Sequence, residues 1–278
     1  MKASWENGWK SWNLEQERRR EAVRRICDDM GLSQDELLDL LMVSPGERFS
    51  HLFVDEFRKA IYCYIPKVAC TNWKKVWMSL VGLTTVKNLS AIPLMVPHEN
   101  GYKMQLVKKL EGPPLEIKLN TYKKLIVVRH PFHRLASAYR DKIQFKGDPL
   151  FQKQVLPFVA KRRPNANLEN IQWPEFVDYV TLGYGKQSDD HWNSYMTLCH
   201  PCALNYDVIA KVETLEEDSE RFLRLIDAPG DLHFPNTSRT SRRIGSTEWE
   251  EYRRQLSSDQ VVALRRAYAR DFQLFEYD

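Results

Sequence analysis

The sequence predicts an α/β protein with a mainly parallel sheet flanked by helices. Three times along the chain, a short apolar stretch is followed by a loop and then by a segment of helical periodicity. The predicted strand and helix pairs are residues 60–65 with 71–80, 124–129 with 133–142, and 206–213 with 215–226. Strands that alternate with helices are typical of parallel sheets covered on both faces.

Composition and periodicity justify each element in order. The first strand is rich in aromatic and β-branched residues, and Trp73, Val76, Trp77 and Leu80 share one face of the helix that follows it. The second strand reads Leu-Ile-Val-Val and ends at an arginine. The third helix starts with a T-x-x-E capping box. Ligands of such sheets bind at the carboxyl ends of the strands.

The remainder of the chain is predicted to be mostly helical. Residues 1–48 are expected to form a helical appendage, with Ser33 and Glu36 as the capping box of its second helix, and residues 49–278 to form the main domain. The polar segment 149–173 is predicted to be irregular with one short helix, and residues 257–272 to return to helix.

Composition narrows the possible functions. The 278 residues include 43% hydrophobic and 28% charged residues, which is typical of a globular protein. A net charge of +4 is too small to favour nucleic-acid binding. No stretch approaches the ~18 apolar residues of a membrane span, and the first 20 residues lack the apolar core of a signal peptide.

The five cysteines leave at least one thiol unpaired within the chain. Cys199 and Cys202 have C-x-x-C spacing, which is compatible with a disulfide, a redox pair or half of a zinc site. No second C-x-x-C completes a zinc site, so no metal is predicted. We expect a local Cys199–Cys202 disulfide in an oxidising compartment, with buried thiols as the alternative.

Two loops carry the chemical argument. The segment Pro66-Lys67-Val68-Ala69-Cys70-Thr71 connects the first strand to its helix, so unpaired N–H groups, the helix dipole and Lys67 all favour an anion there. It lacks both glycines of the G-x-x-x-x-G-K-[ST] motif, which disfavours an ATPase or GTPase. The alternative interpretation is a simple turn with a solvated lysine.

The second loop begins with Arg129, which ends a buried strand, and continues into a helix that contains Ser137. A guanidinium group and a hydroxyl together bind a phosphate directionally, although an arginine in a salt bridge at the sheet edge explains Arg129 equally well. Two anion sites on neighbouring strands suit a ligand with two separated phosphate-like ends. PAPS (3'-phosphoadenosine-5'-phosphosulfate) is such a ligand.

The motifs also resemble a known family. Residues 65–74, IPKVACTNWK, are similar to the 5'-phosphosulfate motif of the Golgi carbohydrate sulfotransferases of the chondroitin 4-O-sulfotransferase and HNK-1 sulfotransferase type. Residues 128–142, VRHPFHRLASAYRDK, resemble the 3'-phosphate motif of that family. The resemblance extends from about Ile61 to the C-terminus. It differs at His130, where the family usually has Asp or Glu, and near His133, where the family commonly has Glu.

The resemblance implies a P-loop-like PAPS-binding sulfotransferase fold and transfer of a sulfuryl group to a glycan hydroxyl without a metal. Lys67 would be catalytic, and the 5'-end would be held by Pro66, Lys67, Val68, Ala69, Cys70, Thr71 and Asn72. The 3'-phosphate would be held by Arg129 and Ser137, with Arg242 or Arg243 closing over it. His98 is the predicted general base, and His191 or a carboxylate is the alternative.

The resemblance further implies a glycan or proteoglycan acceptor, such as a chondroitin-like chain or a terminal GalNAc or glucuronate, and no nucleic-acid partner. It implies a type II membrane protein of the Golgi lumen, whose N-terminal anchor is absent from this sequence. Two glycosylation sequons, at Asn88 and Asn236, agree with a luminal site. The alternatives are a non-catalytic PAP- or glycan-binding relative and a P-loop-like nucleotide kinase.

Overall fold

The computed structural model describes residues 2–44, 48–101, 103–104, 114–144, 147–182, 189–235 and 246–278. The chain divides into two compact units. The first comprises Met1–Val128, Tyr195–Arg239 and Gln273–Glu276, and it contains the sheet. The second comprises Arg129–Ser194, Thr240–Phe272 and Tyr277–Asp278, and its described elements are helices.

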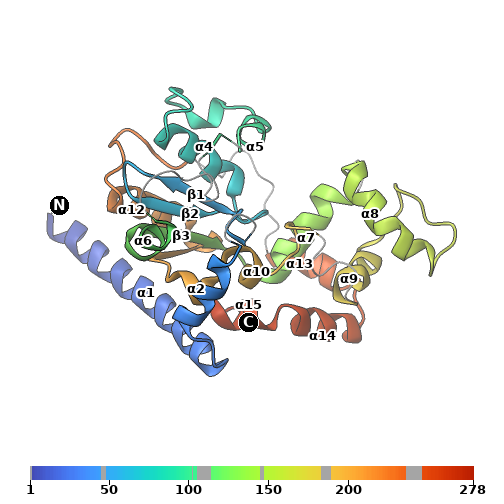
Figure 1. Ribbon diagram of the computed structural model, residues 1–278. Coiled ribbons are helices and arrows are strands. Elements are labelled where there is room, and N and C mark those ends of the chain that lie inside the picture. Colours follow the sequence, from blue (N-terminus) through green and yellow to red (C-terminus); the bar gives the residue numbers. More distant parts are fainter. Residues whose placement is uncertain are drawn as a thin grey trace. The chain divides into compact units, whose positions relative to one another are not determined.

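A four-stranded sheet forms the centre of the first unit (Figure 1). Its strands lie in the order β1 (Leu52–Asp55), β2 (Ala60–Cys63), β3 (Lys123–Val128) and β4 (Val208–Lys211). The pairs β2–β3 and β3–β4 are parallel and β1–β2 is antiparallel, which confirms the predicted mainly parallel sheet. The sequence analysis missed β1, a four-residue strand joined to β2 by a short turn.

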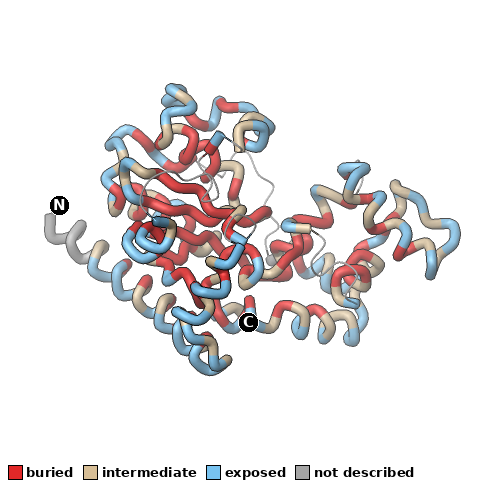
Figure 2. Tube along the Cα trace, in the orientation of Figure 1, coloured by how far each residue is buried: buried red, intermediate tan, exposed pale blue. Residues whose placement is uncertain are grey.

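The strands are short and almost wholly buried (Figure 2). Tyr62 of β2 packs on Trp73 and Trp77 with ring centroids 5.4 and 5.8 Å apart. The helices of this unit are α1 (Lys2–Asp29), α2 (Gln34–Met42), α4 (Cys70–Leu80), α5 (Val96–Glu99), α6 (Leu115–Thr121), α10 (Tyr195–Cys199), α11 (Pro201–Leu204) and α12 (Leu215–Leu225), with 3-10 turns η1 (Leu89–Ala91) and η3 (Val212–Thr214).

Helix α1 protects the edge strand β4. Gln16 accepts a hydrogen bond from the N–H of Ile209 at 2.9 Å, and Arg19 donates one to the carbonyl of the same residue at 2.7 Å. The peptide groups on the outer side of an edge strand otherwise remain open to pairing with another chain. Side chains of α1 form hydrogen bonds with both peptide groups at Ile209. Helix α1 therefore belongs to the same compact unit as the sheet.

Asp218 of α12 is the buried acceptor that holds α1, β4 and α12 together. Its carboxylate is 1% exposed. It accepts hydrogen bonds from Trp12 at 2.7 Å, Gln16 at 3.0 Å, Arg19 at 2.9 Å, Thr214 at 2.6 Å and the backbone N–H of Lys211 at 3.2 Å. Burial disfavours the charged guanidinium of Arg19, but Asp218 and Glu15 together outweigh it and raise the pKa of Arg19.

The disulfides differ from the predicted local pair. Cys199 is bonded to Cys63 at the end of β2, and Cys202 is bonded to Cys27 at the end of α1. Cys70 is the free and buried thiol. His200 adopts a left-handed conformation between α10 and α11, so the two cysteines of the C-x-x-C segment belong to different helices and pair with separate distant cysteines.

The second unit is built around aromatic side chains. Its helices are α7 (Pro131–Lys142), α8 (Pro149–Ala160), α9 (Trp173–Thr181), α13 (Ser246–Arg253), α14 (Ser258–Ala267) and the greater part of α15 (Ala269–Leu274). Its core includes Phe132, Tyr139, Trp173, Phe176 and Trp249. Helix α8 is longer than predicted, because Asp148 caps it and it buries Val155 and Phe158 although Pro157 lies inside it.

Replacing Asp218 tests the role of this buried acceptor. In Asp218→Asn, the buried guanidinium group of Arg19 loses its buried counter-charge and keeps only Glu15, whose side chain is 37% exposed. We expect a loss of about 3–5 kcal/mol in the free energy of unfolding, measured by urea denaturation. Asp231→Asn is the control, because Asp231 pairs with Lys87 at an exposed site; it is expected to change the free energy by less than about 0.5 kcal/mol. Similar small losses in both variants would contradict this role.

Candidate active site

The loop between β2 and α4 adopts a strained backbone. Lys67 and Ala69 have φ angles of 71° and 70°, in the left-handed region. This region costs a residue other than glycine roughly 1–2 kcal/mol, and such strain is concentrated at functional sites. Ala69 is the N-cap of α4 and has no side-chain capping bond. The amino end of the 11-residue helix α4 therefore points its backbone N–H groups toward the loop without a side-chain cap.

Burial of its neighbours fixes the loop in place. Pro66 and Val68 are buried on either side of Lys67, and Cys70 is buried at the first position of α4. Lys67, Thr71 and Asn72 are partly exposed. The loop thus combines an ordered backbone with a lysine that reaches the surface, which is an arrangement suited to an anion.

Thr71 and His98 are brought together by α4 and α5. The Oγ1 atom of Thr71 lies 3.1 Å from Nε2 of His98, within hydrogen-bonding distance. Pro97, the second residue of the short helix α5, directly precedes His98. The structure therefore places the predicted general base directly beside the predicted phosphosulfate loop, although 27 residues separate the two in sequence.

The second predicted motif begins in the second unit. Arg129 directly follows β3 and is 5% exposed, and Ser137 is buried in α7. His130 is the N-cap of α7, where its Nδ1 accepts a hydrogen bond from the N–H of Phe132 at 3.2 Å. An Asp at this position would accept the same bond. The capping function explains how a histidine replaces the acidic residue that is usual in the resembled family.

His133 stacks on His130, with ring centroids 4.4 Å apart. Burial, the neighbouring His130 and the charge of Arg129 together lower the pKa of His133 to about 4. The imidazole of His133 is therefore neutral at the pH of cellular compartments. It adds no positive charge next to Arg129.

Of the other predicted or alternative site residues, the structure describes His191. His191 belongs to the second unit, where its Nδ1 lies 2.6 Å from the carboxylate of Asp189. Arg242 and Arg243 lie outside the described residues. Arg134, in the middle of the 3'-phosphate motif, is 2% exposed and donates to the carbonyls of Asn193 and Asp190 at 2.5 and 2.7 Å. Arg134 therefore anchors α7.

Lys75 is a candidate that the sequence analysis missed. It lies one helical turn after Thr71 on α4 and is 3% exposed. Within the described part of the chain it has no hydrogen bond or ion pair, and burial lowers its pKa. A lysine in a helix is usually solvated, so no sequence signal distinguished it from Lys74, which lies 4.2 Å from the centre of the Tyr64 ring.

The described residues contain neither a candidate metal site nor a candidate membrane-spanning helix. No group of three or more histidine, cysteine or acidic side chains is placed to hold a metal ion there. Among the helices of the described segments, none combines the length and apolar character needed to cross a membrane.

Comparison with known proteins agrees with this geometry. The sulfotransferase family profile matches residues 50–278, so the chain belongs to the sulfotransferase family. That match begins after α2 and includes both candidate loops. It confirms the family indicated by the two motifs.

Among the similar curated proteins, carbohydrate sulfotransferase 11 of Rattus norvegicus is 35% identical over 85% of this chain and 69% of its own length. Carbohydrate sulfotransferase 8 of Mus musculus is 34% identical over 97% of this chain and 65% of its own length. Carbohydrate sulfotransferase 9 of Homo sapiens is 32% identical over 98% of this chain and 62% of its own length. No solved structure gave a significant match.

A test of Lys75 combines stability with binding. We expect Lys75→Met to raise the melting temperature by about 2–4 °C, equivalent to ~1 kcal/mol, because burial of the Lys75 side chain disfavours its charged form. The same change should weaken PAP binding about tenfold, because a positive charge one helical turn after Thr71 is lost. Thermal unfolding and PAP titration measure the two effects.

The control is Lys74→Met, which removes an equal charge from the neighbouring position. Loss of the contact of Lys74 with the Tyr64 ring should lower the melting temperature instead. Unchanged PAP affinity in Lys75→Met would show that Lys75 has no part in anion binding.

The low pKa of His133 predicts a pH dependence of stability. The unfolded chain binds this proton at the ordinary pKa of 6.5 and the folded chain only at about 4. The stability that neutral His133 contributes is therefore complete above pH 6.5 and is lost as the pH falls toward 4. We expect His133→Gln to reduce the slope of unfolding free energy against pH in this window, by at most about 1.4 kcal/mol per pH unit.

Urea denaturation between pH 4 and 7 measures this slope. His233→Gln is the control, because the His233 side chain is 67% exposed. An equal reduction of the slope in both variants would show that His133 is not the source.

Proposed function

We propose that this protein transfers the sulfuryl group of PAPS to a hydroxyl of a glycan. The observation that carries the proposal is the loop 65–71, whose strained backbone, uncapped helix start and Lys67 form an anion site next to His98. Membership of the sulfotransferase family and the similarity to carbohydrate sulfotransferases support the same chemistry. The expected acceptor is chondroitin- or dermatan-like, or a terminal GalNAc or glucuronate.

In the proposed reaction, the acceptor oxygen forms a bond to sulfur and the bond between sulfur and the nucleotide oxygen breaks. PAP leaves, and the hydroxyl proton passes to a base. Lys67 neutralises the charge that develops on the leaving phosphate, a role for a fixed electrostatic group. Thr71 and the N–H groups at the start of α4 hold the 5'-end.

The proposed 3'-phosphate site consists of Arg129 and Ser137, with Arg242 or Arg243 as a further contributor. Because ATP has no 3'-phosphate, this site would select PAPS over ATP. No metal ion takes part in the proposed reaction, since Lys67 and Arg129 supply the positive charge.

His98 is the proposed general base. A histidine titrates near neutral pH, and its Nε2 lies 3.1 Å from the hydroxyl of Thr71, a residue of the proposed donor site. A base must lie within hydrogen-bonding reach of the proton that it removes. The contact with Thr71 supports a position of His98 at the 5'-end of the donor.

We propose that the protein acts in the Golgi lumen, as a type II membrane protein. Two disulfides, Cys27–Cys202 and Cys63–Cys199, are typical of an oxidising compartment. Asn88, the first residue of a glycosylation sequon, is exposed. Both features support luminal exposure.

Lys67→Ala tests the proposed reaction. We expect the rate of sulfate transfer from labelled PAPS to chondroitin, dermatan, desulfated heparan or terminal GalNAc and glucuronate oligosaccharides to fall about 10²–10³-fold. PAP affinity should fall less, because the backbone N–H groups remain. Lys87→Ala is the charge-matched control, since the Lys87 side chain is 82% exposed, and it should retain full activity.

The other outcomes distinguish the alternatives. PAP binding without transfer to any glycan would indicate a non-catalytic relative. Stronger binding of ATP than of PAP would indicate a nucleotide kinase. Failure to bind PAP would refute the proposal.

A further inference from the structure

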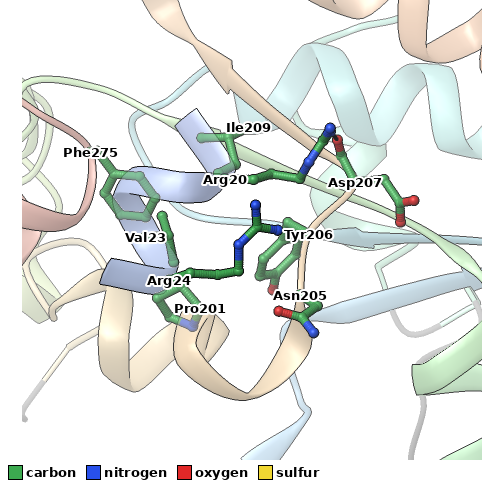
Figure 3. A pocket seen from close by; sticks show the side chains of 9 residues that line it. All are labelled: Arg20, Val23, Arg24, Pro201, Asn205, Tyr206, Asp207, Ile209 and Phe275. Atoms are coloured by element: carbon green, nitrogen blue, oxygen red, sulfur yellow. Dashed lines mark hydrogen bonds between the residues drawn. The ribbon is translucent and has the colours of Figure 1, made fainter. Parts of the chain in front are cut away.

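A hollow lies in the first unit, between α1 and the segment that leads into β4 (Figure 3). Its volume is about 180 Å³, smaller than the roughly 300–1,000 Å³ of pockets for drug-sized ligands. The hollow is therefore of a size for one small unit of a larger ligand.

The hollow has an apolar floor and a polar rim. Val23, Ile209 and Phe275 line the floor and are buried. Arg20 and Arg24 extend from α1 at the rim, and Asn205 and Asp207 come from the segment before β4 (Figure 3). Apolar surface beside hydrogen-bonding groups suits a sugar ring, which presents C–H groups on its faces and hydroxyls at its edge.

The charges at the rim do not cancel. The carboxylate of Asp207 accepts hydrogen bonds from Lys123 Nζ and from the N–H of Lys124, both at 2.9 Å, so it is compensated. Glu17 carries one negative charge between the guanidinium groups of Arg20 and Arg24. Hydrogen bonds from Arg20 and then Arg24 lower the pKa of Glu17, which keeps it ionised. One positive charge remains in excess.

Arg24 is the arginine whose guanidinium group has hydrogen-bond donors left for an anionic ligand. Arg20 is engaged twice, by Glu17 and by the carbonyl of Asp207 at 2.6 Å. Arg24 contacts Glu17 through Nη2, and within the described part of the chain no other bond engages it. Its Nε and Nη1 groups are therefore available for a carboxylate or a sulfate, anions that a guanidinium group binds with two parallel hydrogen bonds.

The hollow is separate from the proposed transfer site. Asp207 precedes β4, and Lys123, its partner, is the first residue of β3, so the hollow lies at the amino ends of the parallel strands. The loop with Lys67 follows the carboxyl end of β2. The six residues of β3 span roughly 20 Å, so a ligand that occupies both places must be several sugar units long.

We propose that this hollow binds an anionic sugar unit of a long acceptor chain, at a distance from the hydroxyl that is sulfated. The inference rests on the proposed function, because an extended anionic glycan is the substrate class that would reach both places. The hollow is lined in part by α1, which lies outside residues 50–278 matched by the family profile. It therefore provides a means by which this chain distinguishes polymers from short acceptors.

The test compares a chondroitin polymer with a disaccharide acceptor, using the full chain and Arg24→Ala. We expect the variant to raise KM for the polymer about fivefold with kcat unchanged, and to leave KM for the disaccharide unchanged. Arg25→Ala is the control, because it removes an equal charge from the next position of α1, its side chain is 66% exposed and it does not line the hollow. Equal effects of both variants, or an equal effect on both acceptors, would overturn the proposal.

Chemically altered polymers identify the anion. Carboxyl-reduced chondroitin is neutral, and its sulfated derivative carries sulfate alone. Dependence on Arg24 should disappear with the neutral polymer. If dependence on Arg24 returns with the sulfated derivative, the site accepts either a carboxylate or a sulfate. If dependence on Arg24 does not return, the site is specific for carboxylates. Dependence on Arg24 that persists with the neutral polymer would contradict an anion site.

Calorimetry of polymer binding without PAPS separates this inference from the proposed function. Binding that weakens in Arg24→Ala, in a protein that transfers no sulfate, would support the site and reject the transferase function. Transfer that is unaffected by Arg24→Ala with every acceptor would support the function and reject the site.

Discussion

The buried carboxylate of Asp218 is the interaction on which the architecture of the sheet unit depends. An ionised group in the interior is tolerated only when hydrogen bonds and an opposite charge replace its hydration. Asp218 obtains these from α1, from the 3-10 turn η3 and from the backbone at the end of β4. Two distant parts of the sequence, α1 and the continuous segment from β4 to α12, must therefore assemble together. With α1 in place, Gln16 and Arg19 also reach the edge strand.

The candidate loop is anchored at both ends, by a disulfide and by aromatic packing. Cys63 ends β2 and is bonded to Cys199, while Tyr62 packs against Trp73 and Trp77 of the helix that follows the loop. Both ends of the segment 64–69 are thereby anchored. This anchoring explains how Lys67 and Ala69 retain left-handed conformations that a flexible loop would relax. Glycine is absent because packing, and not backbone freedom, determines the shape of the loop.

Local pattern predicted the parallel strands, their helices and the phosphosulfate loop, because each is a continuous segment with its own periodicity. Contacts between distant residues were beyond such reasoning. The sequence did not reveal that Thr71 meets His98 or that the cysteines of the C-x-x-C segment pair with Cys27 and Cys63. Lys75 looked like any helical lysine, since only packing determines which lysine is buried. Strand β1 turns directly into β2, so it lacks the following helix by which the other strands were predicted.

The position of β4 has a consequence for biosynthesis. The sheet takes its last strand from residues that follow the first segment of the second unit, Arg129–Ser194. Strand β3 ends at Val128 and β4 starts at Val208, 80 residues later. At about 5–20 residues per second, a ribosome needs roughly 4–16 seconds to make that interval. During this time the apolar edge of β3 has no neighbour. We expect chaperones to bind the nascent chain at this stage. Neither disulfide can form until Cys199 and Cys202 have emerged from the ribosome.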